Sequence, residues 1–273
     1  MDGLNGKTFF ISGASRGIGK AIALRLAEAG ANIVIAAKSI VENEKLGGTI
    51  FTAAEAVEKH GGQALAVACD IRDEAQIAEA MRQTIERFGR LDGVVNNASA
   101  IHLSPTVLLE PKRYDLMMDI NVRGTFMVTQ AAVRLMKNNG GGHVLTLSPP
   151  LPLKPEWLAP YPAYALSKFS MSLLSAAWAK ELAKDRILVN TLWPVTTIAT
   201  AAVRNILGGE GLIARSRHPE IVADAAYFIL KDTQPENTGQ HWLDEDILRK
   251  NQIEDFEKYA VTPGGELQRD IFI

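Results

Sequence analysis

Apolar and polar positions along this chain fall into blocks, and the blocks switch repeatedly between two periods. Short continuous apolar runs bounded by glycine or polar residues are typical of buried strands, and apolar positions at helical spacing are typical of amphipathic helices. The pattern predicts strands at 8–12, 32–37, 64–69, 93–96, 143–147, 188–192 and 241–243, and helices at 18–29, 52–59, 74–88, 115–136, 164–183 and 222–230.

This order of elements favours one fold class. Strands that are apolar over most of their length, separated by helices, indicate a parallel sheet that is covered on both faces. We predict an α/β fold with a doubly wound parallel sheet of the Rossmann type, forming a single domain over residues 1–246. Residues 247–273 fall outside the alternation, and we expect an extension that packs on the same domain or on a neighbouring subunit.

Composition excludes several classes of protein. The 273 residues are 47% hydrophobic and carry a net charge of -2, with acids and bases intermixed, which argues against a nucleic-acid surface or a polybasic membrane patch. The single cysteine, Cys69, excludes an internal disulfide and fits a reducing compartment. No apolar run reaches the roughly 18 residues of a membrane span, and the start lacks the features of a secretory signal. We expect a soluble, cytoplasmic protein, and the histidines show no metal-binding spacing.

A glycine-rich turn, "SGASRGIG" at 12–19, joins the first predicted strand to the first predicted helix. Glycine at such a turn lets the backbone approach a diphosphate, whose charge is stabilised by the unpaired N–H groups of a helix N-terminus. A plain tight turn between a strand and a helix would also need glycine. As a cofactor site, the turn offers as candidate contacts Gly13, Ser15, Arg16, Gly17, Ile18 and Gly19.

The end of the second predicted strand bears on which dinucleotide would bind. Sites for NAD usually place an acid there, roughly 20 residues after the glycine turn, to bind the ribose 2′-hydroxyl. Here Ala36 and Ala37 occupy the strand end and Lys38 follows. A lysine suits a 2′-phosphate, and Arg16 could contact the same group, although Lys38 could also be a solvated residue. The pattern favours NADP(H) over NAD(H).

Tyr164 and Lys168 are four positions apart at the start of a predicted helix, so they share one helix face. A lysine cation near a phenol stabilises the phenolate and lowers the pKa of the phenol towards a value useful for proton transfer. Protonating a carbonyl oxygen while hydride reaches its carbon requires this chemistry. The spacing alone is common, and it gains weight from the glycine turn on an alternating chain.

Taken in order, several motifs resemble those of the short-chain dehydrogenase/reductase family. They are "SGASRGIG", "CDIRD", "VVNNASA", "DINVRGTF", the segment ending in "YALSK", "VNTLWP" and "NTGQ". The resemblance reaches to about Asp246 and implies an oxidoreductase that interconverts an alcohol and a carbonyl. It also implies a homodimer or homotetramer, assembled through the helices predicted at 115–136 and 164–183. The motifs "SPP", "IAAK" and "LWP" resemble one branch of the family, whose animal members carry a further sterol-carrier domain that we expect this chain to lack.

The resemblance also implies roles for individual residues. Tyr164 would be the acid/base, Lys168 would polarise it and hold the nicotinamide ribose, and Asn121 would order a water that connects Lys168 to solvent. Asn121 is a poor helix former inside a predicted helix, so a local kink without a catalytic role is the alternative. The other implied contacts to the cofactor are Asp70, Ile71, Asn97, Ala98, Pro194 and Thr196, with Thr200 as an alternative to Thr196.

The chain departs from the family pattern before Tyr164. Ser148 stands 16 positions upstream, further than the family's usual catalytic serine, and Pro149 occupies the place of the second serine of the family pair. The third catalytic member is therefore either Ser148, brought into place by a reshaped loop, or absent. A lost hydroxyl would slow turnover but leave the hydride and proton donors intact.

These observations lead to a functional prediction with alternatives. We predict an NADP(H)-dependent oxidoreductase that acts on a small, apolar substrate with Tyr164, Lys168, Asn121 and Ser148. The displaced serine supports a second interpretation, an NADP(H)-binding module with little or no catalysis. Isomerisation or epimerisation through a retained cofactor is a third, less favoured because no substrate domain is predicted in the C-terminal part.

Overall fold

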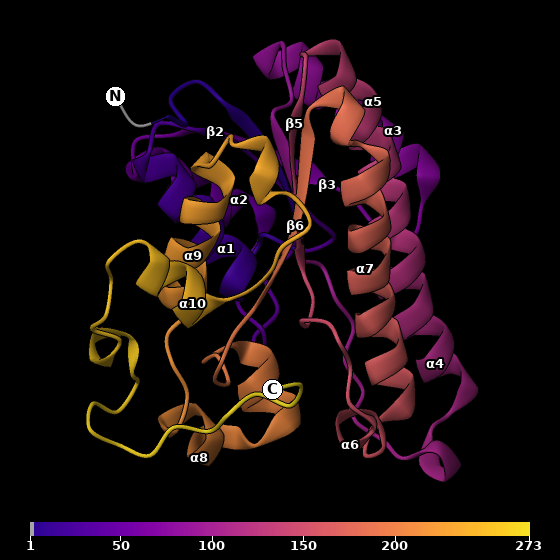
Figure 1. Ribbon diagram of the computed structural model, residues 1–273, viewed down its shortest axis with the longest axis vertical. Coiled ribbons are helices and arrows are strands. Elements are labelled where there is room, and N and C mark those ends of the chain that lie inside the picture. The colour runs from indigo at the N-terminus through magenta and orange to yellow at the C-terminus, as the bar shows by residue number, and fades with distance from the viewer. Residues whose placement is uncertain (1–2) are drawn as a thin grey trace.

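Seven parallel strands form the central sheet of the computed structural model, which describes residues 3–273 (Figure 1). Their order is β3-β2-β1-β4-β5-β6-β7, so the order reverses between β1 and β4. In doubly wound sheets, ligands bind at such a switch point, outside the carboxyl ends of the strands. The strands are β1 (Thr8–Ser12), β2 (Asn32–Ala37), β3 (Gln63–Ala68), β4 (Gly93–Asn96), β5 (Gly142–Leu147), β6 (Ile187–Trp193) and β7 (His241–Leu243).

Helices cover both faces of the sheet (Figure 1). One layer contains α1 (Gly17–Glu28), α2 (Ile50–Lys59), α9 (Glu220–Lys231) and α10 (Asp244–Lys250). The other contains α3 (Glu74–Phe88), α4 (Pro111–Met117), α5 (Thr125–Asn138) and the long α7 (Pro162–Glu181). Two short helices, α6 (Pro155–Leu158) and α8 (Gly209–Ala214), lie beyond the same end of the sheet (Figure 1).

Strand β1 shows why the strands are apolar throughout rather than alternating. Phe9 and Ile11 belong to the apolar cluster under α1 and α9, whereas Phe10 belongs to the cluster under α3 and α5. Because successive side chains of a strand point to opposite faces, a sheet covered on both faces buries all of them. The predicted fold class, a doubly wound parallel sheet, is confirmed.

The helix predicted at 115–136 is longer and is not uniform. It begins at Pro111, passes through a π-helical segment at Met118–Gly124, and continues as α5 to Asn138. Gly124 lies in the π-helical segment, and a Cβ there would come within 2.7 Å of Cδ1 of Ile71. The widened turn thus coincides with a close approach between this helix and the segment that follows β3, a position where π-bulges are often functional.

Residues 247–273 return to the carboxyl edge of the sheet. Ile247 and Leu248, in α10, are buried against the cluster that contains α9. The segment Gln268–Ile273, which we call the pocket segment, then runs beside the chain that follows β6 (Figure 1). It is held by hydrogen bonds from the backbone N–H of Thr197 to the carbonyl of Gln268 (3.0 Å) and from that of Asp270 to the carbonyl of Val195 (3.0 Å).

Candidate active site

Two adjoining cavities open at the carboxyl edge of the sheet. The first, about 510 Å³, is bounded by the glycine turn and by the ends of β2, β3 and β4. The second, about 480 Å³, contains Tyr164 and Lys168 and is lined mainly by apolar side chains. The two cavities share Ile18, Asn97, Ser99, Ile101, Thr200 and Ala202. They therefore form one continuous groove, with room for a long ligand that reaches from the glycine turn to the tyrosine.

The glycine turn has no side chains at Gly13 and Gly19, so a ligand can come close to its backbone. Gly13 adopts a φ of 68°, and a Cβ on it would lie 2.9 Å from the Cα of Ala98. A Cβ on Gly19 would lie 2.8 Å from the carbonyl oxygen of Gly13. Helix α1 begins at Gly17 without a side-chain cap, so its first N–H groups are available to an anion. The turn fits the diphosphate of a dinucleotide.

Arg16, Lys38 and Ser39 line the far end of the first cavity. The Arg16 guanidinium donates to the hydroxyl of Ser39 (2.8 Å) and to the carbonyls of Gly47 (2.7 Å) and Gly48 (3.0 Å), which fixes it against the connection after β2. The Lys38 ammonium is exposed and lies 3.6 Å from the carboxylate of Asp70. Two cations and a hydroxyl thus meet at the end of β2, and Ser39 was not found by the sequence analysis.

Asp70 lines the same cavity, shortly after the end of β3. Its carboxylate accepts hydrogen bonds from Arg72, which hold the pKa of Asp70 down at about 2, and Lys38 adds to that effect. Asp70 is therefore a charged, oriented acceptor. Other predicted cofactor contacts that line this cavity are Gly13, Ser15, Gly17, Ile18, Ile71, Asn97 and Ala98.

Tyr164 and Lys168 project from the first turns of α7 into the second cavity. The Lys168 ammonium donates to the carbonyl of Leu147 at the end of β5 (2.6 Å). Burial lowers the pKa of Lys168 to about 7, against the opposing charge of Asp270. Burial also raises the pKa of Tyr164, and Asp270 raises it further. This direction is opposite to the lowering that the pairing with Lys168 predicts, because burial disfavours the charged phenolate and the carboxylate of Asp270 disfavours it further.

Asn121 lies in the π-helical segment and is fully buried. Its side chain accepts from the N–H of Ala100 (2.8 Å) and donates to the carbonyl of Ala100 (2.9 Å) and to the hydroxyl of Ser167 (2.9 Å). Ser167 in turn donates to the carbonyl of Tyr164 (2.8 Å). Asn121 thus connects the chain after β4 to the first turn of α7.

Ser148 does not join this group. It is fully buried directly after β5, and among residues 3–273 no group pairs with its hydroxyl. Neither cavity counts Ser148 among its lining residues. Of the two threonines considered for the cofactor, Thr200 lines both cavities, whereas the Thr196 hydroxyl is buried and unpaired within the described chain; Pro194 lines the second cavity.

The pocket segment contributes residues that the sequence analysis did not find. Gln268, Arg269, Asp270 and Ile271 all line the second cavity. Phe272 is fully buried with Trp193 and Phe169 beside the Tyr164 ring. The only sequence signal was an apolar "IFI" after a polar stretch, which does not reveal where in the fold it packs.

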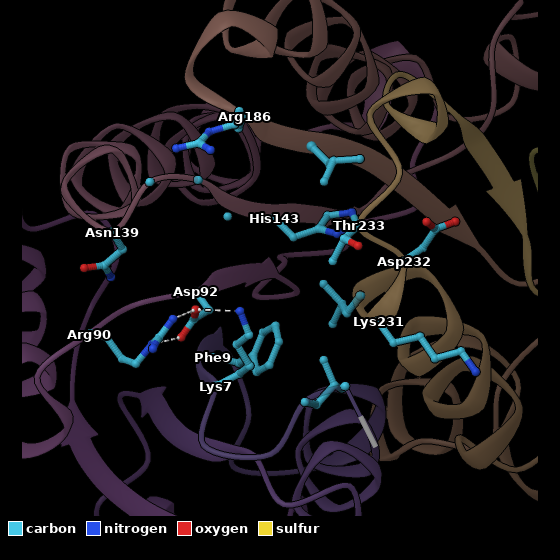
Figure 2. Close-up of a pocket in the computed structure, with 17 residues that line it drawn as sticks. Lys7, Phe9, Arg90, Asp92, Asn139, His143, Arg186, Lys231, Asp232 and Thr233 are labelled. Atoms are coloured by element: carbon cyan, nitrogen blue, oxygen red, sulfur yellow. Dashed lines mark hydrogen bonds and ion pairs between the residues drawn. The ribbon is translucent and has the colours of Figure 1, made fainter. Parts of the chain in front are cut away.

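A separate cavity of about 210 Å³ lies at the opposite edge of the sheet, where the strands begin (Figure 2). Figure 2 shows Lys7 and Arg90 directed at Asp92, which forms an ion pair with each of them. His143 also lines this cavity, and burial lowers its pKa. No residue predicted for the active site lines this cavity.

A model of the short chain dehydrogenase family matches residues 7–210. The chain belongs to the short-chain dehydrogenase family. Its relatives include hydroxysteroid dehydrogenase-like protein 2 from Rattus norvegicus, 49% identical over 271 residues, and from Homo sapiens, 48% identical over 271 residues. These matches cover 99% of this chain but 51% and 64% of the two relatives, so the chain spans about half to two thirds of their length.

Solved structures support the same assignment for the short-chain dehydrogenase. A short chain dehydrogenase from Mycobacterium thermoresistibile is 49% identical with a TM-score of 0.93, covering 99% of this chain and 96% of that one. A second structure, from Xanthomonas campestris, is 46% identical with a TM-score of 0.95, covering 99% and 98%. The predicted family and branch are confirmed, and the family's cofactor is a nicotinamide dinucleotide. Across residues 3–273, no helix is both long and apolar enough to cross a membrane.

Proposed function

We propose that this short-chain dehydrogenase is an NADP(H)-dependent oxidoreductase that interconverts an alcohol and a carbonyl on a small, largely apolar substrate. One observation carries the proposal: Tyr164 and Lys168 line an apolar cavity that is continuous with the cavity at the glycine turn. A dinucleotide lying along the groove would bring its reactive end to the tyrosine.

The proposed roles follow from the surroundings of each residue. The bound dinucleotide supplies or accepts the hydride. The Tyr164 hydroxyl gives a proton to the substrate oxygen in reduction and takes it back in oxidation. A tyrosine is protonated at neutral pH, so the hydroxyl has a proton to give, although burial raises its pKa and makes release of that proton harder. Lys168, fixed on the carbonyl of Leu147, places a donor beside Tyr164 and near the expected ribose.

Three features of the adenosine end support NADP(H). Lys38, Arg16 and Ser39 line the cavity at the end of β2, and the Arg16 guanidinium donates to the Ser39 hydroxyl. Charged donors and a hydroxyl suit a phosphate, whereas the acid expected for a free 2′-hydroxyl does not stand at this strand end. A carveol dehydrogenase from Mycobacterium avium in complex with NAD is 23% identical, which supports a shared fold only.

The remaining assignments are proposals of the same kind. Asn121 is proposed to order the proton path from Lys168, since it ties α7 to the chain after β4. The proposed cofactor contacts are Gly13, Ser15, Arg16, Gly17, Ile18, Gly19, Lys38, Asp70, Ile71, Asn97, Ala98, Lys168, Pro194 and Thr196, with Thr200, which lines both cavities, as the alternative to Thr196. Ser148 stays a prediction.

A homodimer or homotetramer is also proposed. Helices α5 and α7 expose the large apolar side chains Phe126 (41%), Leu166 (52%) and Leu173 (55%), which a second subunit would cover. These are the helices through which the sequence analysis predicts assembly. Light scattering after size-exclusion chromatography tests the state, and a monomer at micromolar concentration would refute it.

The experiment for the proposed function compares loss of NADPH and of NADH absorbance across a panel of aldehydes and ketones. The proposal expects turnover with NADPH and a lower rate with NADH. The KM for NADPH should be lower than the KM for NADH, whichever carbonyl compound is used. Equal use of both dinucleotides would remove the NADP(H) assignment and leave the oxidoreductase.

A second function, dinucleotide binding with little catalysis, is favoured by the position of Ser148. Its hydroxyl reaches neither cavity, so the usual donor to the substrate oxygen is displaced. Ser148→Ala separates the two readings. A fall in turnover of about tenfold or more would place this hydroxyl at the substrate, whereas tight NADPH binding without turnover in the unaltered protein would establish the binding module.

A further inference from the structure

The pocket segment brings a carboxylic acid into the proposed active site. Asp270 is half-buried and lines the second cavity together with Tyr164 and Lys168. Its backbone is paired to Val195, and its Oδ1 accepts from the indole Nε1 of Trp193 (2.9 Å) and from the N–H of Ile271 (2.8 Å). Hydrogen bonds therefore hold both the backbone and the side chain of Asp270 in place.

The second oxygen of this carboxyl group is differently placed. Within residues 3–273, both hydrogen bonds to the carboxyl group reach Oδ1 and none reaches Oδ2, and the residue lines the second cavity. The charges of Lys168 on α7 and of Asp244 at the start of α10 act on Asp270. Arg269 and the phenols of Tyr161 and Tyr164 also line the second cavity. Asp270 thus adds a carboxyl group to the cavity that holds Tyr164 and Lys168.

Phe272 attaches the same segment to the tyrosine itself. The two rings are stacked, with centroids 5.8 Å apart and an interplanar angle of 23°. Phe272 also packs against Phe169 (5.2 Å between centroids) and Trp193 (5.8 Å), and it is fully buried. Trp193 contacts both Phe272 and Asp270, so the ring and the carboxyl group form one packed unit around Tyr164.

We propose that Asp270 is a positioning residue of the active site, which controls the protonation of the Tyr164–Lys168 pair, and that Phe272 anchors it there. The proposal deepens the proposed function and rests on Tyr164 being the acid/base. Asp270 acts through the charge that it places beside the pair, so it need not touch the reacting atoms.

The sign of the effect follows from the charge. An ionised carboxylate favours the ammonium form of Lys168 and disfavours the phenolate form of Tyr164. The pKa of Asp270 is raised by burial to about 7, with the nearby Asp244 adding to the shift, so the group is ionised at the alkaline pH where a tyrosine titrates. Removing its charge will lower the pKa of both partners.

Asp270→Asn is the sharpest variant, because asparagine keeps an acceptor for Trp193 and for the N–H of Ile271. Glu266→Gln is the matched control: it removes one negative charge nearby in the chain, where Glu266 pairs with Arg215 and lines neither cavity. The pH dependence of kcat/KM with NADPH is measured for the unaltered enzyme and both variants. In Asp270→Asn, the alkaline limb of this pH profile, which we assign to Tyr164, is expected to move to lower pH by about one unit. In Glu266→Gln the same limb is expected not to move.

A second measurement does not depend on turnover. The unfolding free energies of Asp270→Asn, Lys168→Met and the double variant form a cycle at pH 7, close to the pKa of both groups. The proposal expects clearly non-additive changes, because the charge of each group alters the protonation of the other.

The outcomes separate this inference from the proposed function. Unshifted pH profiles with an additive cycle would overturn the role of Asp270 even if the enzyme turns over. An unshifted profile with a non-additive cycle would confine Asp270 to Lys168 and overturn its control of Tyr164. An enzyme without turnover would refute the proposed function, and the cycle would still test the coupling of Asp270 to Lys168.

Discussion

The ammonium of Lys168 donates a 2.6 Å hydrogen bond to the carbonyl of Leu147, the last residue of β5. This bond joins the first turns of α7 to the carboxyl edge of the sheet. It holds the buried lysine side chain in a cavity that is lined mainly by apolar residues. The position of Lys168, and of Tyr164 one turn before it, is therefore set by the sheet as well as by the helix.

Replacing Lys168 by methionine is expected to stabilise the protein at neutral and acidic pH while reducing turnover. The unfolded chain takes up the lysine proton below its ordinary pKa near 10, but the folded protein takes it up only below about 7. Between these values the unfolded state binds more protons, so the stability of the unaltered protein falls as the pH falls from about 10 to 7. Urea unfolding at several pH values measures this loss, roughly a few kcal/mol, and Lys168→Met should lack it.

The folding stability of the protein is expected to fall in acid because of His143, which lines the cavity at the opposite edge of the sheet (Figure 2). Its Nε2 accepts from the amide of Asn190, and burial lowers the pKa of His143 to about 4. The unfolded chain binds this proton below about 6.5, so stability is complete above that pH and falls by roughly 3 kcal/mol as the pH drops to about 4.

The variant His143→Gln should not show this loss, because glutamine does not titrate. Its unfolding free energy, although lower at pH 7, should vary less between pH 6.5 and 4 than that of the unaltered protein. His60→Gln, at an exposed position, serves as the control. Equal slopes for the unaltered protein and His143→Gln would show that His143 is protonated in the folded state without cost.

Lys38→Asp is expected to weaken NADPH binding by about 10- to 100-fold and to leave NADH binding nearly unchanged. The change places an acid beside the end of β2 and also leaves Asp70 without its lysine neighbour. Fluorescence titration with each dinucleotide gives the two dissociation constants. Lys45→Asp makes the same charge change at an exposed position outside the cavity lining, and an equal effect there would point to overall charge instead of a 2′-phosphate site.

Asn121→Ala should cost roughly 2–4 kcal/mol of stability and lower turnover. The substitution leaves the N–H and carbonyl of Ala100 and the hydroxyl of Ser167 without their partner in a fully buried place. Denaturant unfolding and kcat with NADPH are the measurements. If stability falls while kcat is retained, Asn121 supports the fold at this point and takes no part in the proton path.

The sheet was predictable because its signals are local. Each strand is a short apolar run, and burial on both faces makes that run continuous, as Phe9, Phe10 and Ile11 show in β1. The glycine turn was also readable, since a φ of 68° at Gly13 is a demand that few residues other than glycine meet.

The active site was only partly predictable, because several of its features depend on contacts between distant segments. Asn121 and Gly124 indicated an irregular helix. They did not indicate that it would contain a π-helical segment packed against Ile71. Asp270 and Phe272 lie about a hundred positions after Tyr164, and no spacing rule connects them. The direction of the pKa shift of Tyr164 likewise depends on burial, which cannot be read from the Tyr164–Lys168 spacing.

The central claim is that Tyr164 is the acid/base of an NADP(H)-dependent reaction, and Tyr164→Phe tests it most directly. The variant removes one hydroxyl and keeps the ring that stacks on Phe272. NADPH consumption with a carbonyl that the unaltered enzyme reduces should fall by roughly 10²-fold or more, while the dissociation constant for NADPH stays within about twofold. Turnover that survives in Tyr164→Phe, with NADPH binding unchanged, would contradict the account.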